Sequence, residues 1–171
     1  ATNKLQSVFS VATSCTRFAL RGHIDFRRYL PVALIVFAGA GCGAFVVQRV
    51  STHVLGYIMP ALILAVLAYM LLSPRMSDAS SASRLSVRGY SPLAAVIGFY
   101  DGFFGPGTGS FFTTSLVALR GMGLTRSAAH TKLFNFASNF ASILLFVAAG
   151  KAIWTLGLLM AACSMTGAWI G

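Results

Sequence analysis

Apolar blocks of about 20 residues divide the sequence, and this spacing restricts what the chain can fold into. Crossing the roughly 30 Å hydrocarbon layer of a bilayer takes about 20 residues of α-helix, at 1.5 Å per residue. We predict spanning helices over residues 5–20, 29–48, 54–72 and 127–149, with another that begins at 152. The sequence therefore predicts an all-α, polytopic transmembrane helical bundle.

Composition supports a membrane protein and argues against a soluble one. Only 9% of the residues are charged, whereas a soluble domain carries about 25%. The net charge of +10 would suggest nucleic acid in a soluble protein. Here most of the cations lie between apolar blocks, where basic loops set the orientation in the membrane. We expect the lipid bilayer as a partner and no nucleic acid.

The three cysteines, Cys15, Cys42 and Cys163, lie inside apolar blocks and form no CxxC pair or Cys/His cluster. Neither a disulfide framework nor a metal site is therefore expected. No sequence pattern calls for a cofactor.

The stretch from 92 to 119 differs from the other blocks because the run Gly105-Pro-Gly-Thr-Gly109 interrupts it. Its two apolar arms are too short to span a bilayer comfortably. They predict a broken helix or a re-entrant hairpin, with one long kinked helix as the alternative. Irregular backbone at membrane depth persists only where protein or a water-filled cavity satisfies its polar groups. We therefore expect this break to border a cavity.

An internal repeat is visible, since residues 1–43 align without a gap on residues 129–171 with nine identities. Lys4 falls on Lys132, and both copies end in Gly-x-x-x-Gly, a spacing that lets helices approach closely in lipid.

Charge predicts the orientation of the two copies. Arginines gather after the first block and in the third linker, and the positive-inside rule places both segments in the cytoplasm: Arg21, Arg27, Arg28, Arg75, Arg84 and Arg88. If 92–119 is re-entrant, Arg120 and Arg126 join them and Lys151 lies outside. The copies are then inverted, and inverted repeats with broken helices are a transporter design.

Four sequence features carry a family resemblance. The run Tyr100-Asp-Gly-Phe-Phe-Gly-Pro-Gly-Thr-Gly-Ser110, the run Ala129-His-Thr-Lys-Leu133 and Asn135 resemble the second-repeat signature of the sulfite exporter TauE/SafE family. Residues 1–7 resemble the end of its first-repeat signature. The resemblance implies a permease of the bacterial inner membrane that exports sulfite, sulfonates or related organic anions.

The repeat also predicts the organisation of the chain. Residues 1–73 would hold the remainder of a first repeat, 74–90 a cytoplasmic linker and 91–171 a truncated second repeat. By alignment of the copies, roughly 38 residues would be missing before Ala1 and roughly 30 after Gly171. We expect a fragment of a longer transporter.

Lys4 and Lys132 are the first candidates for substrate binding. Each lies inside an apolar block, where a charge costs about 2.5–3.5 kcal/mol on insertion scales and usually has a function. Under inverted symmetry the two would approach one cavity and form a doubly positive anion site. The alternative is that both reach out to the headgroups.

The glycine-rich run supplies the second group of candidates: Gly105, Gly107, Thr108, Gly109 and Ser110. Glycines let backbone N–H groups approach an anion, and the second arm would present its positive helix N-terminus there. Asn135 follows Lys132 on one helical stripe and is expected to face the cavity. The alternative for the run is a hinge that serves packing.

Asp101 is the one carboxylate inside an apolar block. It could take up a proton in coupled transport, form an ion pair with Lys132 or cap a half-helix.

The sequence leaves several functions open beside a secondary transporter. A passive anion channel on the same scaffold cannot be separated from a carrier by sequence. An intramembrane serine hydrolase would use Ser110 and His130, but nothing in the sequence orients the histidine. A receptor or assembly subunit is a further alternative. We expect the protein to bind a small anionic substrate and to have no enzyme activity. The sequence leaves open whether it forms a homo-oligomer.

Overall fold

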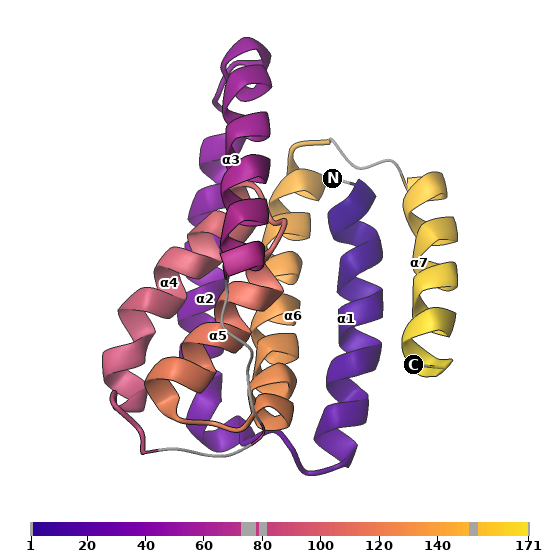
Figure 1. The fold of residues 1–171 in the computed structure, drawn as a ribbon. Helices are drawn as coiled ribbons and strands as arrows, with labels where there is room; N and C mark the ends of the chain where they lie inside the picture. The colour runs from indigo at the N-terminus through magenta and orange to yellow at the C-terminus, as the bar shows by residue number, and fades with distance from the viewer. Residues whose placement is uncertain (1, 73–77, 79–81, 151–153, 171) are drawn as a thin grey trace.

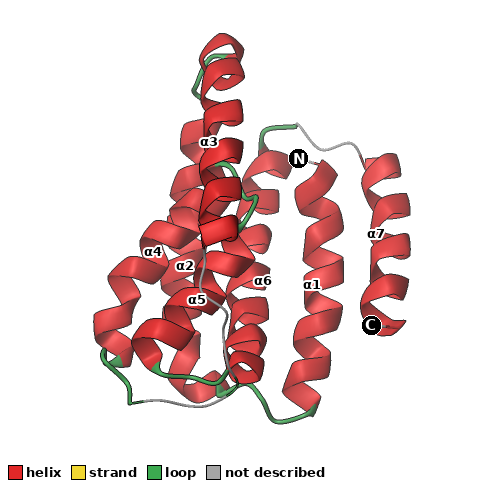
Figure 2. Cartoon of the chain, viewed as in Figure 1, coloured by secondary structure: helices red, strands yellow, loops and turns green. Residues whose placement is uncertain are grey.

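The computed structural model describes residues 2–72, 78, 82–150 and 154–170, and these fold into helices alone, with no strand among them (Figures 1 and 2). The all-α prediction is thereby confirmed. In chain order the helices are α1 (Thr2–Leu20), α2 (Phe26–Val47), α3 (Thr52–Leu72), α4 (Val87–Phe103), α5 (Thr108–Arg120), α6 (Leu124–Ala148) and α7 (Trp154–Ile170). Arg75 and Lys151, which entered the charge count, lie outside the described residues.

Three of the helices, α2, α3 and α6, are long and apolar enough to cross a membrane. They coincide with three of the predicted blocks, within a few residues at each end. Large apolar side chains remain exposed on these helices, such as Leu34, Leu64 and Leu144. Exposed apolar surface of this extent is what a lipid-facing protein presents.

Local sequence explains why α4 begins earlier than the apolar pattern predicted. The Ser86 hydroxyl accepts a hydrogen bond from the Gly89 amide at 3.0 Å and caps the helix. Ser is among the preferred N-cap residues because it satisfies one of the unpaired amides of the first turn. The helix therefore starts at Val87, inside the segment predicted as a linker, and the division into 1–73, 74–90 and 91–171 stays a prediction.

Glycines bring α2 and α4 into close parallel contact. Gly98 packs against Val36, where a Cβ atom on the glycine would lie 2.7 Å from the Val36 carbonyl oxygen. One turn further along both helices, Gly102 packs against the backbone of Ala40. Small residues four apart permit this approach. The contact fixes the position of the C-terminal end of α4.

The helices α4 and α5 form a hairpin that begins and ends at the same end of the bundle (Figure 1). Before α4, the Leu85 amide donates to the Leu119 carbonyl near the end of α5 at 2.9 Å. The Arg120 guanidinium donates to the Ser83 hydroxyl at 2.6 Å and also to the Leu85 carbonyl. The chain thus enters and leaves this stretch side by side, so its two arms form a helical hairpin. Whether this hairpin is re-entrant in a membrane stays a prediction.

Helix directions agree with the predicted inversion, although the repeat itself stays a prediction. In Figure 1, α1 and α6, which the repeat aligns, run in opposite directions, as do α2 and α7. The ends of α1 and α5 and the starts of α2, α4 and α6 lie at one end of the bundle. This end, called the arginine-rich end below, carries Arg21, Arg27, Arg28, Arg84, Arg88, Arg120 and Arg126.

Candidate functional site

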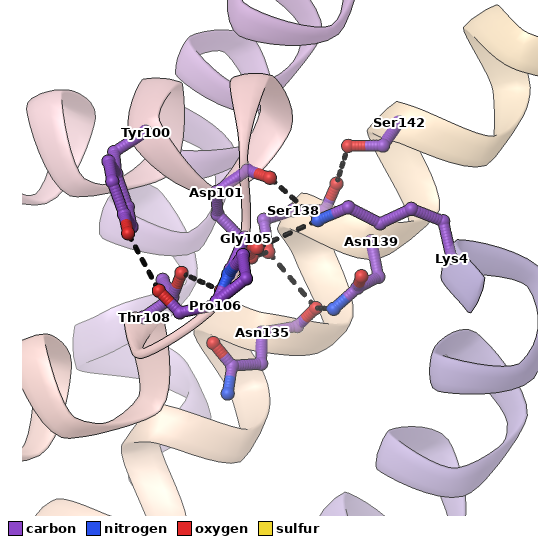
Figure 3. A network of polar contacts seen from close by, with 10 residues as sticks. All are labelled: Lys4, Tyr100, Asp101, Gly105, Pro106, Thr108, Asn135, Ser138, Asn139 and Ser142. Carbon is purple, nitrogen blue, oxygen red and sulfur yellow. Dashed lines mark hydrogen bonds and ion pairs between the residues drawn. The ribbon is translucent and has the colours of Figure 1, made fainter. Parts of the chain in front are cut away.

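Two glycines shape the break between α4 and α5. Gly105 and Gly107 have φ angles of +99° and +80°, a region that residues with a Cβ rarely adopt. The turn satisfies its own carbonyl groups, because the Tyr100 hydroxyl donates to Pro106 O at 2.7 Å and the Thr108 hydroxyl donates to Gly105 O at 2.5 Å (Figure 3). Irregular backbone inside a bilayer requires such partners.

A cavity of about 270 Å³ borders this turn, as the sequence predicted. A water molecule takes up about 30 Å³ of liquid, so the cavity has room for a small anion together with water. Its lining comes from α1, α4, the turn, α5 and α6: Asn3, Lys4, Ser7, Val11, Asp101, Phe104, Gly105, Pro106, Gly107, Thr108, Gly109, Asn135 and Asn139. The structure therefore brings together seven of the nine candidate residues, and whether they bind substrate stays a prediction.

An ion pair joins α1 to the C-terminal end of α4 inside this cavity. The Lys4 ammonium lies 2.7 Å from Asp101 Oδ1 and donates to the Asp101 carbonyl at the same distance (Figure 3). The other carboxylate oxygen accepts a hydrogen bond from the Ser138 hydroxyl of α6. Asp101 therefore pairs with Lys4, and not with Lys132 or with the N-terminus of α5. Both charges are balanced, as buried charges must be.

The N-terminus of α5 opens on the same cavity. Its N-cap residue is Gly107, and no side chain in the described part of the chain makes a capping hydrogen bond there. Uncapped amides and the helix dipole leave partial positive charge at this point. Asn135 lies beside it, since a Cβ atom on Gly109 would be 3.5 Å from Asn135 Nδ2. An anion at this place would meet amide donors from the backbone and from a side chain.

Lys132 lies elsewhere, so the predicted doubly positive chamber is wrong. Lys132 lines a second cavity, together with Arg17 and Arg21, and does not border the first. The reason is its position two turns into α6, near the arginine-rich end, whereas Lys4 reaches the far end of α4. Ser110 is in the first turn of α5 but does not line the first cavity either.

His130 provides no base for Ser110. Its Nδ1 donates to the Arg126 carbonyl at 2.8 Å, and its Nε2 accepts from the Asp25 amide at 3.2 Å. Both ring nitrogens are thus engaged by backbone groups, and the ring is fully buried. The arrangement joins α6 to the start of α2 and gives no serine–histidine pair of the kind that activates a nucleophile.

Sequence reasoning missed several members of the site. Ser138 holds Asp101, and its signal was present, because it is one of the nine identities of the repeat. Asn139 is a further member: its Nδ2 donates to Asn135 O on its own helix at 2.7 Å, and its side chain lines the cavity. Among the described residues no three His, Cys, Asp or Glu side chains gather as metal ligands would.

Comparison with known proteins connects this geometry to a family. The description "Sulfite exporter TauE/SafE" belongs to a family whose sequence pattern matches residues 1–171. A protein of Sinorhizobium sp., named "Probable membrane transporter protein ORF9", is 42% identical over 171 residues, which are 99% of this chain and 66% of that one. No solved structure matches the chain.

Two further relatives are also named as probable membrane transporters. A "Probable membrane transporter protein" of Haemophilus influenzae is 37% identical over 99% of this chain and 67% of its own length. The "Probable membrane transporter protein YfcA" of Escherichia coli K12 is 36% identical over 100% of this chain and 64% of its own. The chain thus spans about two thirds of the length of these relatives. It belongs to the sulfite exporter TauE/SafE family of membrane transporters.

Proposed function

We propose that the chain forms part of the pathway by which a permease exports a small anion, namely sulfite, a sulfonate or a related organic anion, across the bacterial inner membrane. One observation carries this proposal: the uncapped N-terminus of α5 and the Lys4–Asp101 pair open on one cavity at the break between α4 and α5. Broken helices that turn a positive end toward an anionic group are how transporters hold such substrates.

The ion pair gives this site a means to couple anion and proton. With Lys4 bound to Asp101, the ammonium is neutralised and only the amides of α5 attract an anion. A proton on Asp101 removes the negative charge and makes the ammonium available to the anion. Among the described residues that line the cavity, Lys4 and Asp101 are the ionisable ones. Anion and proton therefore bind together, and each raises the affinity for the other by the same factor.

The arginine-rich end faces the cytoplasm in this proposal, as the positive-inside rule requires. The α4–α5 hairpin then enters the membrane from the cytoplasm, and its glycine turn holds the cavity inside the bundle. Export begins at the arginine-rich end.

The experiment uses the complete protein in proteoliposomes loaded with sulfite, with efflux followed over time and with an imposed proton gradient. The Lys4→Met/Asp101→Asn double variant removes both charges and nearly preserves the shapes of the side chains. We expect the unmodified protein to move sulfite and the double variant to lose most of the flux and its response to the proton gradient. Unchanged flux in the double variant would contradict the proposal. Accumulation against a sulfite gradient distinguishes a carrier from a passive channel.

A further inference from the structure

A second polar cavity lies along the helices that line the first one. It measures about 230 Å³ and is lined by Ser14, Arg17, Phe18, Arg21, Lys132 and Ala168. Three of these residues are cations, and none of the described residues in this lining is acidic. The first cavity, by contrast, holds a balanced ion pair. The second cavity is therefore the more positive of the two.

The acidic residues of the sequence are engaged elsewhere. Asp25 accepts a hydrogen bond from the Arg28 amide at the start of α2, and Asp78 accepts two from Thr125 at the start of α6. Asp101 is bound to Lys4. Neither Lys132 nor Arg21 has a side-chain hydrogen bond or an ion pair to the described residues. The like charges of Lys132 and Arg21 at one cavity repel one another, and an anion between these two side chains reduces this cost.

Both cavities follow one seam between α1 and α6. On α1, Lys4, Ser7 and Val11 line the first cavity, and residues 14, 17, 18 and 21 line the second. On α6, Asn139 and Asn135 line the first cavity and Lys132 the second. Steps of three and four residues keep side chains on one face of a helix. The cavities therefore lie end to end along this seam, and the helical rise on α1 from Lys4 in the first to Arg17 in the second is about 20 Å.

We propose that the second cavity is an oxyanion site at which the substrate first binds from the arginine-rich end before it moves along the α1–α6 seam to the first cavity. The ligand chemistry is a sulfo or phospho group with at least one negative charge. Arg17 keeps its guanidinium at the cavity through a hydrogen bond from Nη1 to the Ala168 carbonyl at 2.9 Å. The role as a first binding site rests on the proposed function, whereas the binding of an oxyanion does not.

A first experiment measures transport kinetics of the complete protein in proteoliposomes of phosphatidylcholine, with sulfite presented to the arginine-rich end. The Arg21→Gln/Lys132→Gln variant neutralises two of the cations. We expect its KM to rise at least tenfold with little change in kcat, because a positive cleft concentrates an anion by 10-fold or more. The matched Arg27→Gln/Arg28→Gln variant neutralises two exposed cations of the same end outside the cavity, and its KM should change less than twofold. Equal effects in the two variants would overturn the proposal.

A second experiment separates this site from the proposed function. Binding of inorganic phosphate to the purified complete protein should weaken at least tenfold in Arg21→Gln/Lys132→Gln and persist in the matched control. That result, together with an unmodified protein that moves no sulfite, would retain the oxyanion site and reject the proposed function and the first-binding role. Phosphate binding that is equal in both variants would reject the site, whatever the transport result.

A third experiment distinguishes a free anion from a lipid headgroup with the same chemistry. Native mass spectrometry is carried out on protein from vesicles with and without phosphatidylglycerol. A free anion as the occupant predicts the same lipid content in the unmodified protein and in Arg21→Gln/Lys132→Gln. A phosphatidylglycerol molecule held by the unmodified protein alone, with sulfite KM raised in its presence, would assign the cavity to the headgroup and overturn the first-binding role.

Discussion

The ammonium of Lys4 lies 2.7 Å from both Oδ1 and the carbonyl oxygen of Asp101. One side chain thus balances a buried carboxylate and also satisfies a carbonyl in the last turn of α4. The Asp101 side chain is 4% exposed and that of Lys4 12%. At such burial each charge depends on the other, because an unpaired charge in a low dielectric medium costs several kcal/mol.

Loss of the lysine alone is therefore more harmful than loss of the pair. We expect Lys4→Met to destabilise the protein by about 3–5 kcal/mol, since it leaves the Asp101 carboxylate buried with only the Ser138 hydroxyl. Thermal unfolding of the purified complete protein in detergent measures this effect. The Lys4→Met/Asp101→Asn variant is the control and should recover most of the loss. Equal destabilisation by the single and the double change would show that the ion pair contributes little.

A second prediction concerns the base of the hairpin, which Arg120 closes. This side chain is 8% exposed, and it donates from Nε to the Tyr29 hydroxyl at 3.2 Å as well as to Ser83 and Leu85. Hydrogen bonds from charged groups contribute about 1.5–3 kcal/mol each. We expect Arg120→Met to lower the free energy of unfolding by about 1.5–3 kcal/mol or more. We also expect faster amide hydrogen exchange in residues 83–90. Arg88→Met, an exposed cation near the same end, should leave exchange there unchanged.

Close packing of α2 on α4 gives a third prediction. A Cβ atom on Gly98 would lie 2.7 Å from a backbone carbonyl that cannot move aside without shifting α2. Overpacking of this kind costs typically about 1–3 kcal/mol. We expect Gly98→Leu to lower the unfolding temperature and to reduce the yield of folded protein. Gly56→Leu, at a glycine of α3 with nothing within 4 Å, is the matched change and should be tolerated.

A fourth prediction concerns pH and the start of α6. Asp78 accepts hydrogen bonds from the Thr125 amide at 2.8 Å and from its hydroxyl at 2.9 Å, and these bonds lower the pKa of Asp78 below its ordinary value of 3.8. A pKa that falls on folding means that the ionised form stabilises the fold. This contribution is present in full above the ordinary pKa and is lost as the pH falls through the lower pKa of the folded state.

Asp78→Asn should therefore speed amide exchange at Thr125 at neutral pH, and its difference from the unmodified protein should disappear well below pH 3.8. Because Asp78 is exposed, we expect a local effect and not global unfolding. A difference that persists undiminished into acid would show that the carboxylate charge does not act here.

Much of the fold follows from local patterns, which explains why sequence reasoning reached it. Apolar length predicted α2, α3 and α6, the described helices that are long and apolar enough to cross a membrane. Gly105 and Gly107 predicted the break because their φ angles are accessible to glycine. The start of α4 was misplaced, since one serine cap extends the helix beyond its apolar part. Caps act through single hydrogen bonds and leave no periodic signal.

The partners of buried charges were harder to predict. The sequence placed Lys4 with Lys132 because the two residues align in the repeat. That alignment does not tell how far along the axis of the bundle each lysine lies. Depth depends on where α4 stops against α2, which the glycine contacts of Gly98 and Gly102 set. Asp101 consequently meets Lys4 of α1, a residue 97 positions away in sequence, and no local pattern encodes that contact.

A last prediction separates anion binding from the shape of the turn. A Cβ atom on Gly109, in the first turn of α5, would lie 3.5 Å from Asn135 Nδ2, which is an ordinary contact. Gly109→Ala should preserve or slightly raise stability, because alanine favours a helix by about 1 kcal/mol over glycine. It should weaken sulfite binding by blocking access to the amides.

Gly107→Ala is the contrasting change, because Gly107 has a φ of +80° and a Cβ atom there would overlap the side chain of Val66. This variant should lose stability as well as binding, since the strained backbone alone costs about 1–3 kcal/mol. Sulfite titration and thermal unfolding of both variants measure the two effects separately. If Gly109→Ala bound sulfite as tightly as the unmodified protein, the anion would not rest on the N-terminus of α5, and the positive end of that helix would only stabilise the turn.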